Sequence, residues 1–142
     1  MASASKFQDF VEQLGKGQHD FANDTLKLGL SNTAPNATDT LWSDITEISA
    51  GNGYSAGGMT LDNVTFSEAS GTATLDADNE VLTASGGSIG PFQYVILYNA
   101  TLAGNSPEDP NLILYWDLGA ADTITAGNSR TFTISTNLFT IT

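Results

Sequence analysis

The stretch FQYVILYN, residues 92–99, is apolar on both faces of the strand that it predicts, and so is LILYWDL, residues 112–118. Successive side chains of a strand point to opposite faces, so a strand with one wet face alternates apolar and polar residues. Neither stretch alternates over most of its length. In an antiparallel sheet each strand therefore needs a cover on its outer face. We expect the N-terminal helix or a partner protein to supply that cover.

Most of the remaining chain predicts short strands separated by turn residues. Leu26, Leu28 and Leu30 alternate with polar residues, which is typical of a strand with one face in water. Further strands are predicted over residues 59–66, 71–77 and 80–85, over residues 122–135 as a hairpin turning at Gly127 and Asn128, and around Phe139 and Ile141. Roughly eight to ten such strands indicate an all-β protein. We expect an antiparallel β-sandwich, jelly-roll or immunoglobulin-like, as one domain over residues 1–142.

The N-terminal segment, residues 1–17, predicts a short helix or arm. Its apolar residues follow the spacing i, i+3, i+4 and i+7 of one helix face: Phe7, Phe10, Val11 and Leu14. Ser3 or Ser5 would cap the beginning, and Gly15 and Gly17 would end the helix. A helix of about three turns does not persist alone in water, so the Phe-rich face must pack on the domain or on a neighbouring subunit. These four apolar residues are candidate interface residues.

The composition restricts the possible partners. Among 142 residues there are 16 acidic and 4 basic side chains, which give a formal net charge of -12. Such a charge repels polyphosphates, so we expect no nucleic-acid partner. The absence of cysteine excludes disulfides and thiolate metal sites. No stretch approaches the ~20 apolar residues of a membrane span, and the N-terminus does not have the pattern of a secretory leader, so we expect a soluble, unexported chain with no membrane partner.

The segment EISAGNGYSAGGMTL, residues 47–61, places four glycines around Tyr54. It does not predict a phosphate loop, because no Lys-Ser or Lys-Thr pair follows the glycines and the next residues favour a strand. Two interpretations remain. Tyr54 projects from a tight loop as an anchor for a partner, with Asn52 beside it as a second candidate interface residue, or Tyr54 folds back over the core.

The segment DADNE, residues 76–80, holds three carboxylates at alternate positions: Asp76, Asp78 and Glu80. They could offer oxygen ligands to Ca²⁺, but the segment is not an EF-hand loop, because Val81 stands at loop position six and Gly87 at position twelve. A solvated hairpin turn is the favoured interpretation. We expect no metal and no cofactor.

His19 is the only histidine and the only residue that could serve in a Ser-His-Asp relay. No nucleophile-elbow pattern accompanies it, so we expect it to cap or pack after the predicted helix. A pair of carboxylates for glycoside hydrolysis cannot be recognised from sequence, because such residues meet only in space. Nothing in the sequence argues for an enzyme.

Four segments in order, KFQDFVEQLGKGQHDFANDTLKLGLSNTAP (6–35), GNGYSAGG (51–58), GPFQYVILYN (90–99) and LILYWDLG (112–119), resemble small virion-associated proteins of tailed bacteriophages. The resemblance implies a decoration or cement protein on the outer head surface, made in the host cytoplasm and bound to the major capsid protein. A homo-oligomer is expected, and the local threefold positions of capsids suggest a trimer. The resemblance implies no site residues. The alternative is a tail- or fibre-associated adhesin that binds a host glycan or protein through loops 50–58 or 104–110.

Overall fold

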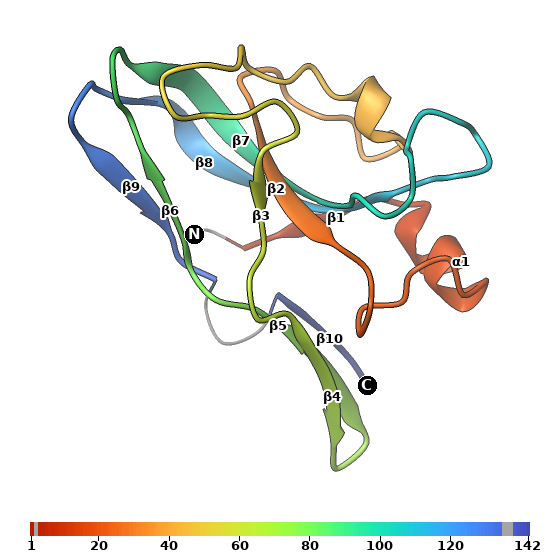
Figure 1. Ribbon diagram of the computed structural model, residues 1–142. Helices are drawn as coiled ribbons and strands as arrows, with labels where there is room; N and C mark the ends of the chain where they lie inside the picture. Colours follow the sequence, from red (N-terminus) through yellow and green to blue (C-terminus); the bar gives the residue numbers. More distant parts are fainter. Residues whose placement is uncertain (2, 135–137) are drawn as a thin grey trace.

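The computed structural model describes residue 1, residues 3–134 and residues 138–142 (Figure 1). In chain order its elements are β1 (Ser5–Lys6), α1 (Phe10–Gly15), β2 (Leu26–Ser31), the 3-10 turn η1 (Trp42–Asp44), β3 (Met59–Thr60), β4 (Thr65–Ala69), β5 (Thr72–Asp76), β6 (Glu80–Thr83), β7 (Ile89–Asn99), β8 (Leu112–Ile124), β9 (Ser129–Phe132) and β10 (Phe139–Ile141). Strands hold 42% of the residues, and all strand pairs are antiparallel. The β class predicted from the sequence is confirmed.

The two apolar stretches form the central pair of a five-stranded sheet, whose strand order is β1-β8-β7-β2-β3. Val95 of β7 lies opposite Trp116 of β8, and Leu97 lies opposite Leu114. Both strands extend beyond their predicted apolar stretches. Each of these two strands has a neighbour on both edges, so its edges are screened from water. The apolar side chains on its two faces must then be covered by other parts of the protein.

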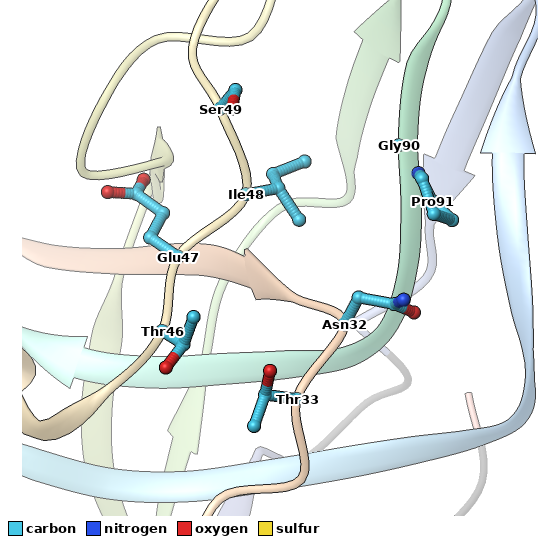
Figure 2. Close-up of a pocket in the computed structure, with 8 residues that line it drawn as sticks. All are labelled: Asn32, Thr33, Thr46, Glu47, Ile48, Ser49, Gly90 and Pro91. Atoms are coloured by element: carbon cyan, nitrogen blue, oxygen red, sulfur yellow. The ribbon is translucent and has the colours of Figure 1, made fainter.

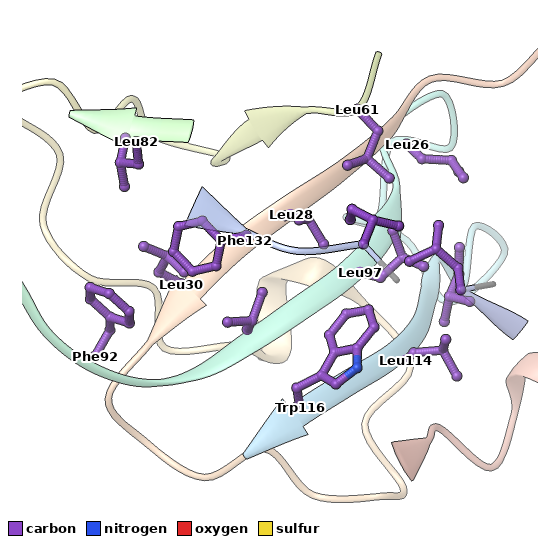
Figure 3. Packing of buried hydrophobic residues seen from close by; sticks show 14 of the residues in the cluster. Leu26, Leu28, Leu30, Leu61, Leu82, Phe92, Leu97, Leu114, Trp116 and Phe132 are labelled. Carbon is purple, nitrogen blue, oxygen red and sulfur yellow. The ribbon is translucent and has the colours of Figure 1, made fainter. Parts of the chain in front are cut away.

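The inner face of this sheet carries the main core. Leu26, Leu28 and Leu30 of β2 alternate toward this core, as predicted, and each is fully buried. The predicted wet face of β2 is wrong, because Gly29 and Ser31 on the other face are buried as well. Figure 3 shows β6 and β9 over the same face, with Leu82 and Phe132 pointing toward the sheet. The short strands β6 and β9 therefore bury the inner face of the sheet.

The outer face of the sheet is covered by the loop over residues 32–48 and by Phe7, not by the helix or a partner as expected. The indole of Trp42 stacks on the ring of Tyr98 of β7, with centroids 4.2 Å apart and an interplanar angle of 8°. Gly29 of β2 lies directly beneath that indole, where a Cβ atom would overlap it. Ile45 packs against the same cluster. The chain thus supplies its own outer layer through a loop that has no apolar periodicity.

The N-terminal helix is shorter than predicted and begins later. Ser5 lies in β1, where it pairs with Tyr115, so neither this serine nor Ser3 caps a helix. Phe7 precedes α1 and is fully buried on the outer face of the sheet, and its backbone N–H donates to the carbonyl of Ile113. The first N–H groups of a helix have no hydrogen-bond partner within the helix. In this chain the backbone before α1 pairs with β8 instead, so Phe7 joins the sheet and not the helix.

The predicted hairpin over residues 122–135 is wrong in its pairing. A turn does occur, with Asn128 donating its backbone N–H to the carbonyl of Thr125. However, β9 pairs with β6, with Ser129 opposite Thr83 and Phe132 opposite Glu80. Through this pairing Phe132 reaches the main core near Phe92, at a ring distance of 6.0 Å. Burial of Phe132 accounts for a pairing that local turn chemistry does not indicate.

A three-stranded sheet of order β10-β5-β4 projects from the end of the main body (Figure 1). Phe66, Leu75 and Phe139 lie side by side across the three strands, so they share one face of this sheet. The predicted strand over residues 59–66 is divided into β3 and β4, because Asn63 between them has a positive φ of 51°. The division sends β4 away from the main sheet and into the projecting sheet.

Candidate functional site

The glycine-rich loop is fastened to the core by Tyr54. The Tyr54 side chain is 2% exposed, and its hydroxyl accepts a hydrogen bond from the Leu30 N–H at 3.0 Å. The same hydroxyl donates to Glu47 Oε1 at 2.8 Å, and that oxygen also accepts from the Gly57 N–H at 2.7 Å. Burial raises the pKa of the Tyr54 phenol above its ordinary value. Of the two interpretations for Tyr54, the structure places its ring in the core, where it offers no surface to a partner.

Asn52 lies at the exposed tip of the same loop. Its φ of 56° is left-handed, and its side-chain amide donates to the Ser88 carbonyl at 2.9 Å. Gly87 approaches this amide so closely that a Cβ there would overlap it. Asn52 therefore holds the loop against the segment that leads into β7.

A shallow polar pocket of about 320 Å³ lies beside this loop (Figure 2). It is lined by Asn32, Thr33, residues 46–49, Gly90 and Pro91. Its hydroxyl and amide groups could bind a polar ligand such as a sugar. Glu47 is the only ionisable side chain among the described residues that line it, and one of its oxygens already holds Tyr54 and Gly57. The pocket is therefore suited to binding more than to acid–base chemistry with a pair of carboxylates.

His19 packs in the core after α1, as the sequence indicates. It is 7% exposed and stacks on Phe21, with centroids 5.6 Å apart. Its Nδ1 lies 3.2 Å from the side-chain nitrogen of Asn99, which also donates to Asp24 at 2.6 Å. Because the Asn99 oxygen accepts from the Thr101 N–H, the amide nitrogen faces His19, and Nδ1 is the acceptor. His19 thus takes part in a structural network.

The three carboxylates of residues 76–80 serve local contacts. Asp76 accepts from the Ala77 N–H at 2.9 Å, Asp78 from the Asn63 side chain at 2.6 Å, and Glu80 from the Asp62 N–H at 3.3 Å. Burial, followed by the charges of Asp62 and Asp78, raises the pKa of Glu80. Within the described part of the chain, no group of three or more acidic or histidine side chains is placed to hold a metal ion.

An apolar groove of about 360 Å³ lies where the N-terminal helix meets the projecting sheet. We call this hollow the apolar groove. Its lining consists of Lys6 of β1, Phe10, Val11 and Leu14 of α1, Leu114 of β8, and residues 139–142. The rings of Phe10 and Phe139 meet in it edge to face, with centroids 5.4 Å apart. Apolar side chains dominate its walls.

Apolar side chains remain exposed around this groove. Val11 is 50% exposed and Ile141 is 39% exposed, and both line the groove. Phe66 is 36% exposed and lies next to Phe139, with ring centroids 6.5 Å apart. Exposed apolar residues that gather in one place mark interaction sites more often than scattered ones do. Val81, at 59% exposure, lies on β6 and does not line the groove.

The four candidate interface residues of the predicted helix lie in two different environments. Phe7 and Phe10 are buried within the chain, on opposite faces of the main sheet. Val11 and Leu14 line the apolar groove. Sequence reasoning missed residues 139–142, which form the other wall. The alternation of Phe139 and Ile141 indicated a strand there, but no local signal indicates that this strand lies beside the helix.

No family model, curated protein or solved structure matches this chain. The helices of the described residues include none with the length and apolar character needed to span a bilayer.

Proposed function

We propose that this chain is a structural protein of a tailed-bacteriophage virion, most specifically a decoration or cement protein on the outer head surface. The observation that supports this proposal best is the apolar groove with exposed Val11 and Ile141, because a protein that works by binding neighbours needs an apolar docking surface. The sequence resemblance of residues 6–35 and of the later segments favours a phage virion as the setting.

The proposed partners are the major capsid protein and further copies of this chain, with a trimer as the assembly. A charge of -12 suits the outside of a shell, away from packaged DNA, and favours a partner with basic patches. In this role the chain acts without catalysis, cofactor or metal, and binds neither nucleic acid nor membrane. Its location is the virion head surface, after synthesis in the host cytoplasm.

The finer fold assignment is part of the same proposal. The five-stranded sheet and the strands over its inner face form two layers with one core between them, which favours an antiparallel β-sandwich.

The test uses heads of the encoding phage from which this chain has been removed. Purified chain should rebind at a saturating stoichiometry and raise the melting temperature of the heads. Val11→Glu places a carboxylate in the apolar groove and should weaken binding, whereas Val81→Glu adds the same charge elsewhere and should not. Failure of the unmodified chain to bind heads would refute the proposal.

The polar pocket of Figure 2 favours a second candidate, a tail- or fibre-associated adhesin for a host glycan or protein. Asn32, Thr33 and Ser49 present amide and hydroxyl groups of the kind that bind sugars. Thr33→Val with Ser49→Ala should then abolish binding to host cells. Unchanged cell binding by this double variant would exclude the pocket as the adhesin site.

A further inference from the structure

The side chain of Asn99 is placed so that only neutral His19 fits beside it. The Asn99 oxygen accepts from the Thr101 N–H at 3.0 Å, and the Asn99 nitrogen donates to Asp24 Oδ2 at 2.6 Å. Because both ends of the amide are held, the nitrogen that lies 3.2 Å from His19 Nδ1 cannot exchange places with the oxygen. A protonated imidazole carries a hydrogen on both ring nitrogens. A proton on Nδ1 would therefore set two donors against each other at this contact.

The second ring nitrogen of His19 gives no compensation. Nε2 is buried, and no described residue forms a hydrogen bond with it. The ring packs against Phe10 and Phe21, with centroids 5.4 Å and 5.6 Å away. A buried charge without hydrogen-bond partners is strongly unfavourable. Protonated His19 would hold two unmatched donors in this site and would regain partners only in water.

The charges around His19 do not reverse this preference. The ionisable side chains on the helix and on the segment that follows it are engaged with other groups of the chain: Asp9, Glu12, Lys16, Asp20 and Asp24. From β7 and β10 the site meets Asn99 and the ring cluster at Phe139, which are uncharged. Burial lowers the pKa of His19, and the opposing charges of Asp24 and Asp9 do not cancel that effect. The folded site thus favours the neutral ring.

His19 is part of the surface on which α1 packs. Phe10 of α1 contacts the rings of both His19 and Phe21. The helix has only six residues, and a helix this short is not stable without packing. The segment after it is attached at its far end, where the Thr25 N–H donates to the Thr101 hydroxyl at 2.7 Å. Loss of the His19 ring from the cluster would therefore loosen α1 and the segment up to residue 24.

We infer that His19 is an acid-sensitive switch that releases α1. A proton on Nδ1 changes the contact with Asn99 from donor–acceptor to donor–donor, and the ring moves into water together with α1 and residues 16–24. The pairing of β2 with β7 and of β7 with β8 remains intact. Because Val11 and Leu14 form one wall of the apolar groove, the groove opens when the helix is released.

Proton linkage gives the direction of the switch. In the released form His19 lies in water and has the ordinary pKa of about 6.5, whereas in the closed form its pKa is lower. Below about pH 6.5 the released form binds more protons, so its population rises as the pH falls. At about pH 5 the increase over neutral pH has an upper limit of ~30-fold, reached when the closed form takes up no proton.

The experiment is amide exchange of the full chain without phage heads, at about pH 7.5 and about pH 5, with the intrinsic exchange rate divided out. We expect residues 10–24 to exchange ~3-fold to ~30-fold faster at the lower pH, with residues 89–99 of β7 unchanged. His19→Phe keeps an aromatic ring without a titratable group and should remove this pH dependence. An equal response of residues 89–99, no response of residues 10–24, or the same response in His19→Phe would each overturn the inference.

A double variant tests the donor–donor contact itself. Asn99→Asp with Asp24→Asn exchanges the two side chains at constant net charge, so that a carboxylate oxygen faces Nδ1 and accepts from the protonated ring. Residues 10–24 should then stay protected at about pH 5, and acid release as in the unmodified chain would contradict the mechanism. Nitrogen NMR of His19 in the unmodified chain depends on no variant. It should show the hydrogen on Nε2 at neutral pH, and a hydrogen on Nδ1 would overturn the inference.

The consequence for the virion rests on the proposed function and is tested separately. Heads that bind the chain at neutral pH should release it at about pH 5 and should retain His19→Phe. Heads that bind neither protein at neutral pH would refute the proposed function and leave the switch standing. Acid-resistant binding of the unmodified chain would show that release of α1 does not open the groove to its partner, and would overturn that step.

Discussion

The rings of Phe10 and Phe139 meet edge to face, with centroids 5.4 Å apart and an interplanar angle of 72°. Phe10 belongs to α1 and Phe139 to β10, so this contact joins two elements that lie near opposite ends of the described chain. Phe21 and Phe66 extend the contact into a cluster of aromatic rings. The apolar groove exists because this cluster holds the helix beside the strand edge.

Removal of the Phe10 ring should therefore destabilise the fold and open the groove together. Phe10→Ala leaves a cavity in the core and should lower the free energy of unfolding by about 3 kcal/mol. Phe66→Ala, at a ring that is 36% exposed, should cost about 1 kcal/mol. Urea unfolding of both variants checks the difference. Equal losses would contradict the assignment of Phe10 to the core of the cluster.

Gly29 should tolerate no side chain, because the indole of Trp42 occupies the space where a Cβ would lie. Gly29→Ala must displace the ring from Tyr98 and should lower the free energy of unfolding by about 1–3 kcal/mol. Gly15→Ala is the matched control, since nothing lies within 4 Å of its Cβ position and alanine favours a helix. Thermal unfolding distinguishes the two. A neutral Gly29→Ala would show that the loop over residues 32–48 does not pack on the sheet.

The hydroxyl of Tyr54 should matter for stability and not for partner binding. Tyr54→Phe leaves the buried Leu30 N–H without its acceptor and releases Glu47, which should cost about 1–3 kcal/mol. Tyr94→Phe is the control, because the Tyr94 hydroxyl has no hydrogen bond within the described residues. A Tyr54→Phe variant of unchanged stability but weakened partner binding would restore the interpretation of Tyr54 as a surface anchor.

His19 should make the protein less stable in mild acid. Burial lowers the pKa of His19 in the folded state, opposed by the charges of Asp24 and Asp9, whereas the unfolded chain keeps the ordinary pKa of about 6.5. The unfolded state then binds more protons below about pH 6.5, so the free energy of unfolding falls as the pH drops from there toward the folded pKa. Above about pH 6.5 this contribution is fully present.

The measurement is the free energy of unfolding against pH for the unmodified chain and for His19→Gln. The variant should show a flatter profile between about pH 6.5 and pH 5. Exposed carboxylates such as Glu12 and Asp117, whose pKa values are lowered, lose their contributions at lower pH and stay unchanged in both proteins. Parallel profiles in the upper window would contradict the buried, neutral state of His19.

The central strands could be predicted because their signal is local. The runs at 92–99 and 112–118 are apolar on both faces, and only a strand buried on both sides accommodates them. The alternation of Leu26, Leu28 and Leu30 likewise indicated the face of β2 that packs in the main core, although the opposite face is buried too, beneath Trp42. The spacing of apolar residues and the polarity of side chains are properties of one segment, so they can be recognised without knowing which segment it pairs with.

The remaining arrangement depends on pairs that meet only in space. Nothing around Phe132 indicates that β9 pairs with β6 across some fifty residues, and the nearby Gly127–Asn128 turn favoured the wrong partner. Trp42 lies in a polar loop, so its place over Gly29 has no periodic signal. The apolar groove could not be predicted either, because its two walls meet only in space. The helical spacing of Val11 and Leu14 could be read, but the wall formed by residues 139–142 comes from the opposite end of the chain.

A density map of the virion, at a resolution that traces the chain, tests the proposed role of this protein most directly. We expect the protein on the outer head surface, with the apolar groove between α1 and β10 against a capsid subunit. A chain located in the tail, or one on the head whose α1 and β10 face open solvent, would contradict this role.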